Sequence, residues 1–172
     1  MSQALEPGVS PACRIRLEFG ARSLRERDPL PLVLDFLAGL PGLAEKRQEL
    51  FLILSELFYN ALDHGLLRIE SSIKEEDEGF SRFYELRDER RAALADGRIR
   101  LELEHRPGEG DAGGELLMVV EDSGGGFDFE REFPEFVANL GSSGRGIPLV
   151  RSLCRELRYV APGNRVEAVY VW

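Results

Sequence analysis

The chain has 172 residues, of which 43% are hydrophobic and 31% are charged. These values are ordinary for a soluble globular protein, and the length suits one domain that buries most of its surface. The net charge of −9 repels the phosphates of nucleic acid, so we expect no nucleic-acid partner. No apolar run approaches the ~20 residues that span a bilayer, and no signal-peptide pattern is present, so we expect a cytoplasmic protein without membrane contact.

The chain begins with a segment, residues 1–12, that is small, polar and punctuated by proline. This composition predicts a disordered tail or a linker to an upstream domain. The folded domain is expected to span residues 13–172. Its two cysteines, Cys13 and Cys154, are too few for a disulfide framework and lack metal-ligand spacing, so we expect reduced, buried thiols.

The first half of the chain alternates between strand and helix patterns. Apolar residues alternate over 13–19, which predicts a half-buried strand. A short apolar helix is expected over 30–40, and the longest helical pattern spans 45–67. The highly charged segment 70–96 is predicted to be an insert, a loop followed by a helix with one buried face. The thin apolar stripe of that helix consists of Phe80, Phe83, Tyr84 and Leu86.

The second half of the chain is dominated by strand patterns. A final helix is expected over 147–158, after an irregular stretch over 127–143. Helices that bracket antiparallel strands predict an α+β fold, a two-layer sandwich whose mixed, mostly antiparallel sheet carries helices on one face. The strands of this half are expected at 98–105, 115–122, 158–160 and 165–172.

Two polar residues interrupt the apolar face of the longest predicted helix. Glu56 and Asn60 are four residues apart, so their side chains project from the same face. Asparagine is a mediocre residue inside a helix, although a solvated stripe on an amphipathic helix would explain both groups. The functional alternative is an amide oxygen that binds Mg²⁺, beside a carboxylate that orients or deprotonates a nucleophile.

A second polar group stands at the end of an apolar strand, where Asp122 is followed by three glycines. A simple turn would explain glycines here, because glycine readily adopts positive φ. Gly124 and Gly126 would also let a ligand approach the backbone closely. An ionised Asp122 could then accept hydrogen bonds from an exocyclic amino group such as that of adenine.

A third motif, Gly144-Arg145-Gly146, leads into the last predicted helix. A glycine-rich entry to a helix N-terminus binds anions, because free amide groups and the helix dipole point at the ligand. A flexible loop is an equally good explanation of this motif alone. A P-loop is excluded, since it needs a lysine beside its last glycine and neither Lys46 nor Lys74 lies near these glycines.

Histidine chemistry is not indicated. His64 precedes Gly65 and is expected to interact with the dipole at a helix C-terminus. His105 ends a strand and is expected to be structural. No Ser-His-Asp arrangement or metal cluster is apparent around either residue.

The three motifs occur in a specific order. Glu-x-x-x-Asn-Ala-x-x-His-Gly is followed by Asp-x-Gly-x-Gly-Phe and then by Gly-x-Gly-Ile at a helix start. This order resembles the nucleotide site of the GHKL-type ATPases, which have the Bergerat fold and include gyrase, heat-shock chaperones, histidine kinases and mismatch-repair proteins. The resemblance covers roughly residues 14–172. It is closest to bacterial anti-sigma-factor serine kinases, and the charged insert resembles versions fused behind a receiver and a serine phosphatase domain.

The resemblance implies ATP and Mg²⁺ as cofactors and assigns roles to the motif residues. Glu56 would be the general base and Asn60 the Mg²⁺ ligand. Asp122 would hold the adenine amino group. The adenine-side wall would be formed by Gly124 and Gly126. The triphosphate would be bound by Gly144, Arg145 and Gly146. We expect residues 127–143 to form a mobile lid over the triphosphate.

The resemblance also implies a serine/threonine protein kinase that phosphorylates a STAS-type anti-sigma-factor antagonist. The alternative is an ATP-binding regulatory module that sequesters a sigma factor or an antagonist with little catalysis. A homodimer and a fused upstream receiver or phosphatase domain are further partners to consider. A histidine kinase would need a phosphoaccepting histidine on an upstream helical domain, which His64 and His105 do not provide. The helix of the insert is expected to pack on its own domain or to dock a partner.

Overall fold

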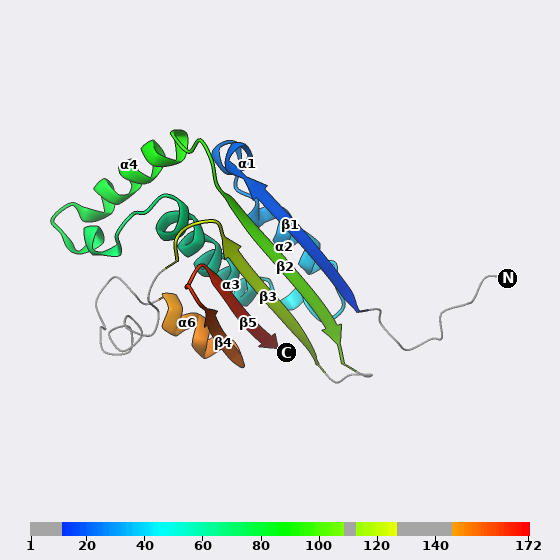
Figure 1. Cartoon of the computed structure of the whole chain (residues 1–172). Helices are drawn as coiled ribbons and strands as arrows, with labels where there is room; N and C mark the ends of the chain where they lie inside the picture. Colours follow the sequence, from blue (N-terminus) through cyan, green and yellow to red (C-terminus); the bar gives the residue numbers. More distant parts are fainter. Residues whose placement is uncertain (1–11, 109–112, 127–145) are drawn as a thin grey trace.

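The computed structural model describes residues 12–108, 113–126 and 146–172 (Figure 1). Its centre is one antiparallel sheet of five strands in the order β1-β2-β3-β5-β4. Helices α2, α3 and α6 cover one face of this sheet, while α1 and α4 lie at one end (Figure 1). The predicted α+β fold with helices on one face is therefore confirmed.

Most predicted elements are confirmed within two residues. The strands are β1 (Cys13–Gly20), β2 (Arg98–Pro107), β3 (Gly114–Asp122), β4 (Glu156–Val160) and β5 (Arg165–Val171). The helices are α1 (Ala21–Glu26), α2 (Leu30–Ala38), α3 (Arg47–Asn60), α4 (Gly79–Ala92) and α6 (Gly146–Leu153). Shorter helical turns are η1 (Ala44–Lys46), η2 (Ala61–Leu66) and η3 (Ser71–Glu75).

Two predicted helices end differently in the structure. The last helix was expected to reach residue 158, but α6 ends at Leu153 because β4 joins the sheet from Glu156 onward. The helix expected over 45–67 is divided into η1, α3 and the π-helix η2. In η2 the amide of Leu67 donates to the carbonyl of Leu62, five residues earlier, at 2.8 Å. Apolar spacing does not distinguish this geometry from a regular α-helix.

The hydrophobic core lies between the sheet and the helices. Alternate residues of β3, namely Leu116, Met118 and Val120, face the helices and are at most 1% exposed. Leu54 and Phe58 of α3 meet them and are equally buried. Full burial of one such side chain is worth about 1.5–3 kcal/mol, so the α3 face is a major source of stability.

The other face of the sheet carries a lattice of arginine and glutamate side chains. Arg16 Nε lies 2.9 Å from Glu102 Oε1, and Arg165 Nη1 lies 2.9 Å from Glu121 Oε2. Such half-exposed pairs contribute little each, but the arginine stems cover apolar surface. Other pairs on this face are Arg14–Glu104, Arg106–Glu115 and Arg158–Glu167.

The insert forms the loop and helix that the sequence predicts, but its stripe is not buried as expected. Phe83 is 2% exposed, whereas Phe80 and Tyr84 are 50% and 56% exposed. The stripe prediction is therefore wrong for the latter two residues. The inner face of α4 is occupied by Phe83 and by arginines that bond to the rest of the domain, so Phe80 and Tyr84 lie on its outer side.

The remaining structural expectations concern cysteine and histidine. Cys13 and Cys154 are free thiols but only half-buried, so full burial was wrong. Burial raises the pKa of the Cys154 thiol to about 11. His105 is structural as predicted, because its Nε2 lies 2.9 Å from the Pro41 carbonyl and its ring stacks on Trp172. Within the described ranges, every helix is too short or too polar to cross a membrane.

Candidate functional site

Three chain segments that are distant in sequence meet on the helix side of the sheet. They are the end of α3 with η2, the end of β3 with its glycine turn, and the start of α6. Contacts join α3 to α6 and η2 to β3. Because Asp122 continues the inward-facing row of β3, its side chain points toward the helices and not toward the charged face.

Glu56 and Asn60 are joined by a hydrogen bond, and the Glu56 carboxylate lies against the start of α6. The Asn60 side-chain amide donates from Nδ2 to Glu56 Oε1 at 2.9 Å. A Cβ atom at Gly146 would lie 1.8 Å from the Glu56 carboxyl carbon, so any other residue at 146 would displace this carboxylate. The structure therefore brings Glu56, Asn60 and Gly146 together in one cluster.

The hydrogen bond within this cluster sets the orientation of the amide. With Nδ2 of Asn60 directed at Glu56, the carbonyl oxygen Oδ1 is turned away from that carboxylate. An amide oxygen is a suitable ligand for a hard cation such as Mg²⁺. Both side chains are half-buried, so they remain accessible to a ligand.

Tyr159 of β4 belongs to the same neighbourhood, although sequence reasoning missed it. Burial raises the pKa of the Tyr159 phenol, and the negative charge of Glu56 raises it further. This electrostatic effect places the phenol close to the Glu56 carboxylate. The only sequence signal was the alternation of a short strand, which does not single out one residue.

Asp122 lies in a tight cradle made largely of backbone. Its side chain is 7% exposed, and the amide of Gly124 donates to Oδ1 at 2.7 Å. Burial raises the pKa of Asp122 to about 6, although the Gly124 hydrogen bond acts in the opposite direction. A buried carboxyl group with a strongly shifted pKa is typical of functional sites.

Gly65 of η2 forms the other wall of this cradle. A Cβ atom there would lie 2.5 Å from Asp122 Cγ, and one at Gly124 would lie 2.3 Å from the Gly65 carbonyl oxygen. Glycine is thus needed at both positions for close approach. The sequence motif includes Gly65 as its last residue but gives no role to it, whereas the structure places it against Asp122. His64 itself contacts the Ile69 carbonyl through Nδ1 and Ser71 through Nε2.

The turn between β4 and β5 is bonded to the backbone of Asp122. Asn164 Nδ2 donates to the Asp122 carbonyl at 2.7 Å, and the Asp122 amide donates to the Asn164 carbonyl at 2.9 Å. Gly126 has a φ of +74° and packs against the Pro162 carbonyl, where a Cβ atom would lie at 2.2 Å. Asn164 was missed because a Pro-Gly-Asn turn looks like an ordinary loop in the sequence.

Some predicted site elements cannot be placed. Gly144, Arg145 and the expected lid over 127–143 lie outside the described residues. In the part of the chain that the structure describes, no group of three or more His, Cys, Asp or Glu residues is arranged to hold a metal.

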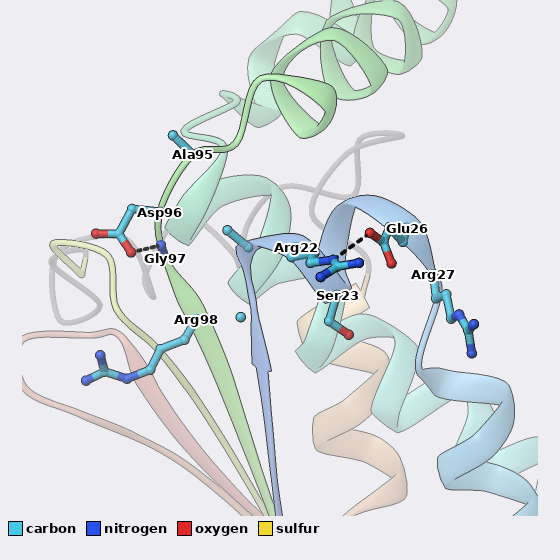
Figure 2. Close-up of a pocket in the computed structure, with 10 residues that line it drawn as sticks. Arg22, Ser23, Glu26, Arg27, Ala95, Asp96, Gly97 and Arg98 are labelled. Carbon is cyan, nitrogen blue, oxygen red and sulfur yellow. Dashed lines mark hydrogen bonds and ion pairs between the residues drawn. The ribbon is translucent and has the colours of Figure 1, made fainter.

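Figure 2 shows an open hollow at the end of β1 and the start of β2, lined by residues 20–23, 26–27 and 95–98. Both of its acidic side chains already have partners, since Arg22 Nε lies 2.9 Å from Glu26 Oε1 and the Gly97 amide donates to Asp96 Oδ1 at 2.7 Å. None of the predicted site residues lines it. We therefore assign the functional site to the Glu56 and Asp122 clusters and not to this hollow.

Comparison with known families decides the general identity of the domain. The family model for the histidine kinase-like ATPase domain matches residues 32–170, which include both clusters. The chain belongs to this family. The resemblance to GHKL-type ATPases is confirmed at this level. No curated protein matches the chain significantly.

The ATPase family implies ATP as the ligand, and the described residues fit it. Asp122 offers a buried acceptor next to Gly65 and Gly124, whose missing side chains leave room for close backbone approach. Glu56 and Asn60 lie beside the N-terminus of α6, where backbone amides favour anionic groups. An adenine beside the Asp122 acceptor and phosphates beside the backbone amides at the start of α6 would match these features.

Proposed function

We propose that this ATPase domain is a serine/threonine protein kinase of the anti-sigma-factor type, with a STAS-type antagonist as substrate. The observation that carries the proposal is the Glu56 carboxylate, held by Asn60 and packed against Gly146 at the start of α6. A domain that only binds ATP has no need of a carboxylate there. A domain that transfers phosphate to a hydroxyl group does need a proton acceptor near the phosphates.

Nucleotide binding is assigned to Asp122 and Asn60. When bound, Mg·ATP supplies the phosphoryl group that is transferred. Asp122 accepts a hydrogen bond from the adenine amino group, and Asn60 Oδ1 is a ligand of Mg²⁺. One protein oxygen is a reasonable share for Mg²⁺, because this ion takes most of its ligands from phosphates and water.

Glu56 orients the substrate hydroxyl group and accepts its proton. Its hydrogen bond from Asn60 leaves the second carboxylate oxygen for the substrate. A positioned base of this kind contributes typically ~10²–10⁴-fold to the rate. The half-buried position of Glu56 allows a serine or threonine of another protein to reach it.

The test is a phosphotransfer assay with labelled ATP and a panel of STAS-type proteins. Glu56→Gln is expected to bind ATP like the wild type while losing transfer. Glu45→Gln, a substitution at an exposed position just before α3, is the matched control and is expected to keep full activity. Transfer at the wild-type rate by Glu56→Gln would contradict the role of this residue.

The same assay separates the kinase from the alternative function. A regulatory module would bind ATP and retain a sigma factor or antagonist in a nucleotide-dependent complex, yet transfer no phosphate to any panel member. Size-exclusion chromatography with and without ATP would detect such a complex. That outcome would replace the kinase proposal and leave ATP binding intact.

A further inference from the structure

Helix α4 of the insert turns three of its four arginines toward the rest of the domain. Phe83 is buried on this inner face, and three arginines follow it at helical spacing. Arg91 Nε donates to the Leu24 carbonyl at 2.6 Å, which ties α4 to the end of α1. The other two arginines, Arg87 and Arg90, contact η2 and the residues directly after it.

Arg87 forms a buried ion pair with the π-helix. Its Nε lies 2.7 Å from Asp63 Oδ1, and the two side chains are 17% and 8% exposed. The guanidinium group also lies over the ring of Tyr59, 4.5 Å from the centroid. At this depth the attraction is only weakly screened by solvent, so the pair restrains Asp63 strongly.

Arg90 binds the backbone where the chain leaves η2. Its Nη1 donates to the carbonyls of Leu67 and Arg68 at 2.8 and 2.7 Å. Arg68 has a φ of 53°, a conformation that is uncommon for residues other than glycine. Arg90 therefore stabilises a chain exit that the local sequence does not favour by itself.

The restrained turn carries Gly65, which touches the Asp122 carboxylate. A π-helical turn is rare and is retained where other contacts hold it. If η2 relaxed to α-helical hydrogen bonding, its residues would rotate about the helix axis and Gly65 would leave its position against Asp122. The contacts thus form a continuous path from α4, through Asp63 and Gly65, to the adenine cradle.

We propose that α4 is a clamp for the adenine cradle, with Arg87 and Arg90 as positioning residues that hold η2 in its π-helical form. This inference rests on the proposed binding of adenine at Asp122. It assigns the insert a role in nucleotide recognition that the minimal ATPase fold does not contain. The clamp acts on recognition of the base and not on the phosphate end of the site.

The test compares ATP with ITP, which carries a carbonyl in place of the adenine amino group. The variant is the double substitution Asp63→Asn with Arg87→Gln, which removes the ion pair without leaving a buried charge. Calorimetry is expected to show a roughly tenfold loss of ATP affinity with little change for ITP. Arg82→Gln, on the exposed side of the same helix, is the control and is expected to change neither.

Hydrogen exchange without nucleotide provides an independent measurement. The double variant is expected to lose protection at the amides of Leu67 and Ile69, which are bonded to the carbonyls of Leu62 and Asp63. Equal weakening of ATP and ITP, or unchanged protection of these amides, would overturn the clamp. If the wild type itself did not distinguish ATP from ITP, the adenine contact of the proposed function would fail, while the exchange experiment would still test the restraint on η2.

Discussion

Two buried aspartates near Gly65 have opposite environments. Asp63 is 6% exposed and forms an ion pair with Arg87, whereas Asp122 is 7% exposed and accepts a hydrogen bond from the Gly124 amide. Among the described residues, no cation forms an ion pair with Asp122. Burial raises the pKa of both groups, but at Asp63 the positive charge of Arg87 opposes the increase. Asp63 thus has a permanent counterion. Asp122 instead keeps free acceptor capacity that is available to a ligand.

The largest effect is expected from removing the counterion of Asp63. Arg87→Ala should lower the free energy of unfolding by about 3–5 kcal/mol, because it leaves a buried charge without its partner. Asp122→Ala should change it far less, since that carboxylate has no counterion to leave behind. Urea denaturation of the two variants measures the difference. Equal destabilisation would mean that Asp122 is also a structural residue.

The second effect concerns nucleotide binding at Asp122. Asp122→Ala should lose most affinity for ATP, because an unpaired polar group costs about 1–3 kcal/mol. Wild-type protein should prefer ATP to GTP in calorimetry. Equal affinity for the two nucleotides would show that Asp122 does not read the adenine amino group.

Gly65→Ala should weaken ATP binding by a similar amount, although Asp122 itself is not substituted. Its Cβ atom would lie 2.5 Å from Asp122 Cγ, so the carboxylate must move. Gly20→Ala is the matched control, because a Cβ atom at that position meets nothing within 4 Å. Wild-type affinity in Gly65→Ala would show that the cradle tolerates displacement.

The pH dependence of ATP binding and of stability should reveal the raised pKa of Asp122. The proposed adenine contact needs ionised Asp122, so ATP affinity should fall up to tenfold per pH unit below about 6. The free protein should respond in the opposite sense. Because the folded-state pKa is raised, protonation favours the fold, and stability is lost as pH rises from about 4 to about 6. Asp122→Asn should remove the pH dependence of ATP affinity in calorimetry. It should weaken that of stability in thermal melts, where the raised pKa of Asp63 still contributes.

The smallest effect is expected for an exposed ion pair on the open face of the sheet. Arg16 pairs with Glu102 at 2.9 Å, but its side chain is 66% exposed. Arg16→Gln should change the free energy of unfolding by less than about 1 kcal/mol. A larger loss of stability in urea denaturation would show that the charged lattice acts as a network. Its contribution to stability would then be closer to that of the Asp63–Arg87 pair.

The sequence predicts the fold well where one physical rule dominates. Alternation along β2 and β3 follows from the one-sided burial of an antiparallel sheet, and both strands are where the pattern places them. The pairing of Glu56 with Asn60 follows from helical spacing alone. The roles of these two residues remain predictions.

The missed features depend on contacts between distant segments. Gly65 has no local need for glycine, and the reason for it is the Asp122 carboxylate. Arg87 looked like one of many charges on a solvated helix, because its partner Asp63 is 24 residues away. The π-helix η2 was also not predicted. Apolar spacing indicates which side of a helix is buried, but not which carbonyl accepts the hydrogen bond of each amide.

The position of Trp172 has a practical consequence for optical experiments. This residue is the only tryptophan in the chain, and its backbone exchanges hydrogen bonds of 3.0 and 3.2 Å with Gly114. Gly114 and Asp122 are the two ends of β3, which places them roughly 26 Å apart at the usual rise of a strand. Tryptophan emission is therefore a probe of sheet unfolding, and a nucleotide at Asp122 should leave it unquenched. Measuring nucleotide binding by fluorescence needs a fluorophore on the nucleotide.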